Sequence, residues 1–224
     1  MIESRLPIMR KDKSKKIINT CLYKLKFSAI FYLIIALLLS ACVTPPLVQI
    51  KPQSIQQRTE QLQKLDNWQV AGKIAFIQNN QRQSASLQWR YQGETQSQQL
   101  DLTTFLGINV LHLNSIDGIH QVKVDGKSYK SDNLQELIGS LTGLSFPTQA
   151  LSYWLKGLPY HQNDQIIYHP DNQLPKQLIG QDNNEIWTIN YDHYTLVDQY
   201  QLATKFTIKK NNLFIKIVIH KWTL

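Results

Sequence analysis

Apolar positions along the chain change their spacing, and each spacing predicts a different element. An almost unbroken apolar run covers 27–39, and residues 54–66 then place apolar side chains three or four positions apart, which predicts a short amphipathic helix. From Trp68 onward the period becomes two, the period of a strand with one buried face. This pattern predicts strands over 68–78, over 84–91 and near 95–104.

Turn-forming pairs divide the rest of the chain into further strands. Asp117-Gly118 and Asp125-Gly126 each stand between strand-like runs, and such pairs favour type I′ turns because both central residues need positive φ. Together they predict a three-stranded meander. Asn211-Asn212 predicts another tight turn. Further strands are expected over 185–191, 204–210 and 213–222.

Two helices are expected midway along the chain. The first follows Asp132, its predicted N-cap, and ends at Gly143, whereas the second begins near Pro147 and runs through Leu155. The segment 160–184 is expected to be a polar loop. Many antiparallel strands with few helices predict a mainly β domain of the α+β class, an antiparallel barrel or strongly curved sheet with helices against its concave side.

The N-terminal segment has the three parts of a secretory signal. Basic residues precede the thirteen-residue apolar run over 27–39, and the small residues Ser40 and Ala41 then precede Cys42. An uncleaved membrane anchor is the alternative, but a bilayer span needs about 20 apolar residues. The Leu-Ser-Ala-Cys pattern favours a lipobox, in which Cys42 receives lipid and becomes the new N-terminus. Its acyl chains would anchor the protein through about 0.8 kcal/mol per buried CH₂ group.

This interpretation divides the chain into three segments. Residues 1–41 are the predicted lipoprotein signal peptide, 42–53 the lipidated cysteine and a proline-bearing tether, and 54–224 the folded domain. Val43 stands where Asp favours retention in the inner membrane of many Gram-negative bacteria, so we expect a lipid-anchored protein on the periplasmic face of the outer membrane. Translation from Met9 would give a more ordinary basic region than translation from Met1.

The formal net charge of +8 is located mainly in the predicted signal peptide. Residues 1–41 hold eight basic and two acidic residues of the chain's 24 and 16, which leaves 16 basic against 14 acidic residues, a net charge of +2, from Cys42 onward. A polyanion-binding surface therefore loses its main support, and we expect no nucleic-acid partner.

No motif for catalysis or metal binding stands out. The six histidines lack the short spacings of zinc ligands, and with only Cys21 and Cys42 present the folded domain can form no disulfide and offers no thiolate. The sequence contains neither a Gly-x-Ser-x-Gly elbow nor a phosphate-binding glycine loop. We therefore expect no enzyme, no metal and no cofactor.

Two apolar features each allow two interpretations. The helical stripe is either ordinary core or a lid over a lipid-binding cavity, and its lid candidates are Leu134, Leu137, Ile138, Leu151, Trp154 and Leu155. At the connection after the third strand, Phe105, Leu106 and Gly107 either fold back into the core or form an apolar tip that meets a membrane or a partner.

Five stretches, in order, resemble the LolB family of outer-membrane lipoprotein receptors. They are WQVAGKIAF (68–76), ASLQWRY (85–91), LDLTTFLG (100–107), PTQALSYWLKGLP (147–159) and LFIKIVIHKW (213–222). With the lipobox they cover nearly the whole predicted mature chain. The resemblance implies an unclosed antiparallel β-barrel whose apolar interior is covered by helices, and no nucleotide or metal.

The resemblance also implies a function. A LolB-like protein would accept cargo lipoproteins from the periplasmic carrier LolA and place their acyl chains in the inner leaflet of the outer membrane. The family has a protruding loop with an exposed leucine, to which Leu106 before Gly107 corresponds. The family commonly reads Gly-Pro-Leu-Gly there, whereas this chain has Thr104-Phe105-Leu106-Gly107.

The expected binding site follows from the strand pattern and the resemblance together. The predicted cavity wall consists of Trp68, Val70, Ile74, Phe76, Leu87 and Trp89. The protein is expected to be a monomer whose partners are LolA, cargo lipoproteins and outer-membrane lipid. A lipid-anchored, lipocalin-like module for another apolar ligand is the alternative, and a lipoprotein hydrolase is a third hypothesis.

Overall fold

A computed structural model of the protein describes residues 53–104, 106–143 and 146–224. The predicted signal peptide over 1–41, Cys42 and the predicted tether up to residue 52 lie outside the described residues, as does Phe105.

The described chain forms one antiparallel sheet of eleven strands in the order β6-β5-β4-β3-β2-β1-β11-β10-β9-β8-β7. The edge strands β6 and β7 do not pair with each other, so the sheet is unclosed, and the predicted mainly β architecture is confirmed. The strands are β1 (Asn67–Gln78), β2 (Gln81–Gln92), β3 (Ser97–Thr103), β4 (Asn109–Ile116), β5 (Ile119–Val124), β6 (Lys127–Ser131), β7 (Gln165–Tyr168), β8 (Pro175–Asp182), β9 (Glu185–Val197), β10 (Tyr200–Lys210) and β11 (Leu213–Thr223).

The tight turns follow the sequence closely. Asp117 and Gly118 have φ of 51° and 74°, and Asp125 and Gly126 have φ of 49° and 74°, so both pairs adopt the left-handed conformation that a type I′ turn requires. The meander β4–β5–β6 is confirmed. Asn211 likewise has φ of 51° in the β10–β11 hairpin.

Two strands and one helix cap differ from the sequence prediction. Residues 160–184 were predicted as a polar loop, but they contain β7 and β8. Four of the eight residues of β8 are polar, and after the buried Pro175 its alternating buried positions are Leu178 and Gly180, so the pattern is short of apolar positions. The N-cap of the first central helix is Asn133 and not Asp132, because its side chain accepts a hydrogen bond from the backbone N–H of Glu136.

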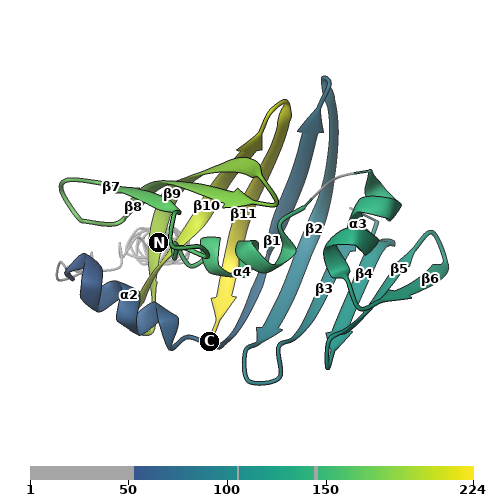
Figure 1. Ribbon diagram of the computed structural model, residues 1–224, viewed down its shortest axis with the longest axis horizontal. Coiled ribbons are helices and arrows are strands. Elements are labelled where there is room, and N and C mark those ends of the chain that lie inside the picture. Colours follow the sequence, from purple (N-terminus) through teal and green to yellow (C-terminus); the bar gives the residue numbers. More distant parts are fainter. Residues whose placement is uncertain (1–52, 105, 144–145) are drawn as a thin grey trace, which may run out of the picture. The chain divides into compact units, whose positions relative to one another are not determined.

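Three helices lie against one face of the sheet (Figure 1). Helix α2 (Ile55–Gln63) begins with a capping box formed by Ser54 and Gln57, and α3 (Leu134–Thr142) ends at Gly143, whose φ is 69°. Helix α4 (Thr148–Trp154) follows Pro147, as predicted. Among the described residues, no helix has the length and hydropathy that crossing a membrane requires.

A buried arginine fixes helix α2 to the rest of the domain. Arg58 is 4% exposed, and its Nη2 donates to the carbonyl oxygens of Lys156 at 3.0 Å and Gln201 at 3.3 Å. Lys156 in turn donates from Nζ to the carbonyl oxygen of Leu65, 3.0 Å away, just after the helix. Burial lowers the pKa of both cations. These bonds place α2 against the segment after α4 and against β10.

Two tyrosines near Arg58, the buried Tyr191 and the partly buried Tyr194, predict a loss of stability in alkali. Tyr191 donates to the carbonyl oxygen of Trp154 and Tyr194 to that of Pro175, and burial raises the pKa of both phenols. Because the folded state favours the neutral phenol, this stability is present below the unfolded pKa of about 10 and is lost as pH rises above it, by about 1.4 kcal/mol per pH unit for each group.

Urea unfolding on both sides of about pH 10 measures this effect. In Tyr194→Phe the unfolding free energy is expected to fall less steeply with pH in alkali, because one of the two phenols is missing. At neutral pH the variant is expected to be about 1 kcal/mol less stable, because it lacks the hydrogen bond to Pro175. An unchanged alkaline slope in a Tyr191→Phe/Tyr194→Phe double variant would contradict this assignment.

Candidate functional site

An apolar cavity of about 790 Å³ lies between the sheet and the two central helices. Strands β1 to β5 and β11 form its wall. Helices α3 and α4, together with Phe146 between them, form its cover. The volume falls within the range of about 300–1,000 Å³ that is typical of ligand pockets. The apolar lining consists of Ile74, Phe76, Ala85, Leu87, Trp89, Leu100, Leu102, Val110, Leu111, Leu113, Val124, Ile138, Leu141, Phe146, Leu151 and Ile217.

Strand register explains why these side chains face one another. Leu87 on β2 pairs with Leu102 on β3, which pairs with Leu111 on β4, so three leucines form one row across the inner face. Ile74 stands between Ala85 and Ile217 in the next row. Since side chains of directly paired residues point to the same face, the alternating pattern of each strand builds one continuous apolar wall.

The cavity exists because the two covering helices pack into separate cores. Leu134 and Leu137 of α3 pack with Leu113 and Val122 in a small cluster over β4 and β5. Helix α4 belongs to the large cluster over the other strands. Lining residues between the two, such as Leu102, are only partly buried. An apolar ligand that covered them would gain about 25 cal/mol per Å².

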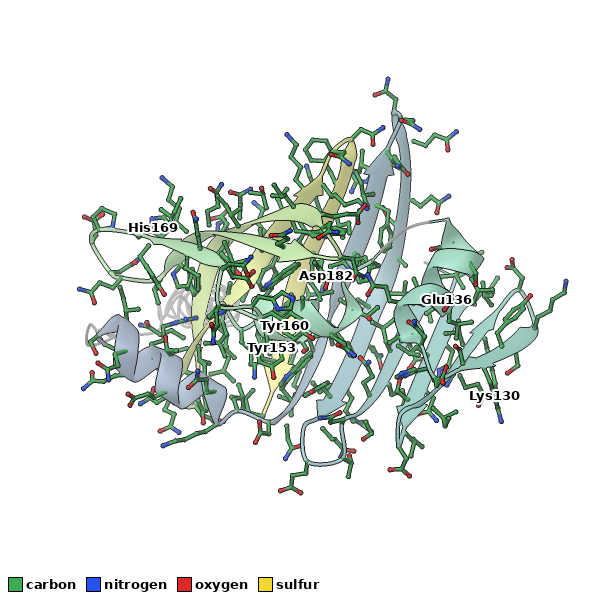
Figure 2. All side chains as sticks on the ribbon, in the orientation of Figure 1. Lys130, Glu136, Tyr153, Tyr160, His169 and Asp182 are labelled. Atoms are coloured by element: carbon green, nitrogen blue, oxygen red, sulfur yellow. The ribbon has the colours of Figure 1, made fainter. Side chains whose placement is uncertain are left out.

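Helix α4 is held firmly on the sheet. The Trp154 ring lies against Gly180 of β8, where a Cβ atom would be 2.4 Å from ring atom Cζ2. Only glycine permits this approach. The indole Nε1 also donates to Asp164 Oδ2 at 3.0 Å, and the same carboxylate oxygen accepts the backbone N–H of Tyr160 at 2.8 Å. Figure 2 shows Tyr160 beside Tyr153 of α4, and their ring centroids are 5.2 Å apart.

Helix α3 is attached more lightly to the β8–β9 side of the domain. Gln135 Nε2 donates to Asp182 Oδ2 at 3.1 Å, across the gap between α3 and the β8–β9 hairpin. Glu136 and Asp182 in Figure 2 mark the two sides of this gap. The inward-facing Ile138 and Leu141 are only partly buried, because they face the cavity.

The structure places the predicted wall residues in two groups. Ile74, Phe76, Leu87 and Trp89 line the cavity. Trp68 and Val70 share the same inner face but do not line it, because they lie nearer the start of β1 and are packed in the large core. The Trp68 ring contacts those of Trp89, Tyr91 and Trp222, with centroids 4.9, 5.5 and 5.8 Å apart.

The predicted lid residues divide in the same way. Ile138 and Leu151 line the cavity. Leu134 and Leu137 pack beneath α3, and Trp154 and Leu155 are buried beneath α4 at 0% and 1% exposure. The stripe therefore contains both of the roles that its pattern allows, core and cavity cover.

Sequence reasoning missed much of the wall on β3 and β4. Leu100, Leu102, Leu111 and Leu113 line the cavity. The signal was present, since the period of two continues through both strands and the Asp117-Gly118 turn fixes the neighbouring hairpin register. Phe146 had no such signal, because it lies between two helices.

The loop between β3 and β4 presents apolar side chains to solvent. Leu106 is 81% exposed and Ile108 is 62% exposed, so neither belongs to the core. Gly107 has φ of 78°, and the Thr104 N–H donates to the carbonyl oxygen of Ile108 at 2.8 Å, which closes a compact turn. Val110, which follows this turn on β4, lines the cavity and is 38% exposed. Apolar surface thus extends from the cavity to the loop tip.

Charged and ligating groups are sparse around this site. Asp125 is the one charged side chain among the cavity-lining residues. Within the described ranges, no three His, Cys, Asp or Glu side chains gather as metal ligands. The described lining can hold an apolar chain by burial.

Comparisons with known proteins agree on one family. The family model described as outer membrane lipoprotein LolB matches residues 66–222. The outer-membrane lipoprotein LolB of Psychromonas ingrahamii is 33% identical over 197 residues, 87% of this chain and 94% of that protein. The LolB of Vibrio cholerae is 34% identical over 200 residues, 84% and 92% of the two chains.

Solved structures show the same fold at low sequence identity. A putative outer membrane lipoprotein-sorting protein domain from Vibrio parahaemolyticus has a TM-score of 0.53 and 8% identity, over 75% of this chain and 89% of that one. A LolA superfamily protein from Nitrosomonas europaea has a TM-score of 0.51 and 10% identity, over 77% and 94% of the two chains.

Proposed function

The chain belongs to the outer membrane lipoprotein LolB family, and from this premise we propose that it accepts lipoproteins from the periplasmic carrier LolA and inserts them into the inner leaflet of the outer membrane. Membership of this family supports a role of the protein in localising lipoproteins to the outer membrane, and the family is not one of enzymes. The handover from the carrier and the use of the cavity are the steps that we add.

The observation that carries the proposal is the apolar cavity of about 790 Å³ beside an exposed apolar loop. Acyl chains are the common part of all lipoproteins, and burial binds them without directional contacts. One cavity can therefore serve cargo proteins of unrelated sequence. The lining places aliphatic side chains on the sheet and helix sides, and its one carboxylate, Asp125, is in an exposed turn.

The loop between β3 and β4 is the proposed exit toward the membrane. Leu102 and Val110 line the cavity at the two ends of this loop, and the exposed Ile108 and Leu106 continue the apolar surface to its tip. Phe105 and Gly107 complete the proposed membrane-insertion tip. A bilayer that received Leu106 would gain about 1.5–3 kcal/mol of apolar burial, which lowers the barrier for a chain that leaves the cavity.

The membrane anchor belongs to the same proposal. In this proposal Cys42 carries lipid, residues up to 53 form a tether, and the domain from residue 54 onward is monomeric. The lipid and the tether would keep the cavity within reach of the outer membrane. No input of energy is needed if cargo moves down an affinity gradient from carrier to receptor to bilayer.

Depletion of the protein in its own bacterium tests this function. We expect other lipoproteins to accumulate on the carrier in the periplasm and to be lost from the outer-membrane fraction. Correct sorting in depleted cells would contradict the proposal. Extraction of the purified protein followed by mass spectrometry tests the lipocalin-like alternative, which requires a soluble metabolite in place of acyl chains.

A further inference from the structure

The two ends of the sheet differ in the charge of their turns. Antiparallel pairing places the 104–108 loop at the same end as four hairpins, and the four remaining strand connections at the opposite end. We name the first the loop end and the second the far end. Figure 1 shows the β1–β2 and β10–β11 hairpins at the top and the β2–β3 turn at the bottom. The loop-end hairpins turn at 79–80, 125–126, 183–184 and 211–212, and the far-end connections are 93–96, 117–118, 169–174 and 198–199.

Three of the four loop-end hairpins use asparagine where their turns need positive φ, and the fourth uses Asp125, with φ of 49°. Asn79, Asn80, Asn183, Asn184 and Asn211 have φ between 48° and 62°. Asparagine and aspartate both tolerate this left-handed conformation, so turn geometry leaves the charge open. The two hairpins nearest the centre of the sheet also touch. Asn212 Nδ2 donates to Asn79 Oδ1 at 2.8 Å.

The far end uses carboxylates in the same kind of position. Asp117 and Asp198 have φ of 51° and 53° at their turns. With Glu94 and Asp171, each far-end connection holds one exposed acidic residue, and Lys176 is the one lysine or arginine within two positions of these connections. Figure 2 shows His169 at the β7–β8 connection of this end.

Basic residues balance the few acids of the loop end. Arg82, Lys127 and Lys209 are exposed beside its hairpins. Of the acids, Glu185 is paired with Lys210 at 2.7 Å and Asp182 accepts a hydrogen bond from Gln135. The third acid is Asp125, which is two residues from Lys127. The loop end is therefore close to neutral or slightly basic.

Exposed apolar residues alone do not distinguish the two ends. The far end exposes Ile116 and Ile119 at 53% and 52%, much as the loop end exposes Ile108 at 62%. These two isoleucines flank Asp117, however, so the far-end tip combines apolar surface with a carboxylate. The loop-end tip has no charged residue from Thr103 to Asn109.

We propose that the loop end is an interaction surface for the headgroups of an anionic bilayer, and that the acidic far end holds the opposite side of the domain away from it. The inference rests on the proposed function in one respect, that the 104–108 tip meets the membrane. A negative bilayer surface attracts basic residues and repels carboxylates within a Debye length, about 8 Å at physiological salt. Charge would thus orient the exit loop before any apolar side chain inserts.

Fluorescence quenching tests this orientation without cargo. Because Cys42 is predicted to be lipidated and Cys21 removed, a single new cysteine would carry the label. The test compares a label on Gln81→Cys at the loop end with a label on Gln199→Cys at the far end, each in the lipid-anchored protein. The vesicles contain phosphatidylcholine, phosphatidylglycerol and a lipid that carries a quencher on its headgroup. The loop-end label is expected to be quenched several-fold more, and high salt should remove the difference.

Charge variants make the test specific. A triple variant replaces three turn asparagines by aspartate without changing the turn conformation: Asn79→Asp, Asn183→Asp and Asn211→Asp. Each added carboxylate is expected to lower the quenching ratio of the loop-end label to the far-end label about fivefold, so the three together should abolish the preference. The reciprocal variant, Asp117→Asn with Asp198→Asn, removes two of the four far-end carboxylates and should weaken the preference, while the loop-end label stays the more strongly quenched one. Thermal unfolding checks that both variants remain folded.

Other outcomes overturn the inference. Equal quenching of the two labels in the protein without charge substitutions would show that charge does not orient the domain. Stronger quenching of the loop-end label that persists in the triple aspartate variant would show the same. A loop-end label that only the carrier protein shields would assign this end to a protein partner. Failure of the proposed function is separable, because a chain without receptor activity in cells would still show the quenching difference.

Discussion

Replacement of Leu106 by glutamate is expected to leave folding and cargo uptake intact and to slow release of cargo into membranes by about tenfold or more. The side chain is 81% exposed, so its loss should change the unfolding free energy by no more than about 0.5 kcal/mol. Insertion of leucine into the bilayer is worth about 1.5–3 kcal/mol, and a carboxylate at the tip forfeits it. Transfer of a labelled lipoprotein from the loaded protein to vesicles measures the rate.

Ile116→Glu is the matched control for this variant. Ile116 is 53% exposed at the far-end tip, so the change adds the same charge to another exposed apolar residue. Its release rate should stay within about twofold of the original, because a far-end residue contributes no burial in the membrane. Equal slowing by both variants, or unfolding of the Leu106 variant, would refute the assigned role of the loop.

Local rules predicted most strands and helix ends of this fold. Where turn chemistry is specific, as at Asp117-Gly118 and Asp125-Gly126, the structure agrees with the sequence. The prediction failed at β7 and β8, which pair as successive hairpins, β7 with β8 and β8 with β9, without an alternating apolar pattern of their own. Gly180 illustrates the reason: it is buried by the Trp154 ring, and a glycine carries no hydrophobic signal.

The candidate site was only partly predictable because a cavity is a property of packing. Period-two patterning gives the face of a side chain, so Trp68 and Ile74 were assigned correctly to one side of β1. It does not give the position along the strand at which the covering helices separate. Trp68 lies where aromatic rings fill the interior, and Ile74 lies where α3 and α4 leave a space.

Exposure of the loop was equally beyond the sequence. Leu106 had two interpretations of equal standing, core and tip, since a short apolar segment carries no period. The hydrogen bond from the Thr104 N–H to the Ile108 carbonyl oxygen closes the turn on itself. Leu106 lies within this turn and is 81% exposed, and the family resemblance added the expectation that it matters.

Ala85→Phe is expected to weaken cargo binding while it raises the stability of the fold. Ala85 lines the cavity on β2, and the larger ring would fill space that an acyl chain needs. Loss of roughly 100 Å² of buried contact at about 25 cal/mol per Å² costs about 2.5 kcal/mol, which weakens acyl-chain binding on the order of 50-fold. The unfolding free energy should instead rise by about 0.5–2 kcal/mol, because the ring fills an apolar cavity.

The neighbouring residue supplies the control. Ser86 is exposed on the opposite face of the same strand, so Ser86→Phe adds the same ring outside the cavity and should leave cargo binding unchanged. Titration with a fluorescent fatty acyl probe and urea unfolding measure the two quantities. Opposite signs, with binding weaker and the fold more stable, are what an acyl-chain cavity requires. Unchanged binding in the Ala85 variant would mean that cargo is held elsewhere, whatever its stability.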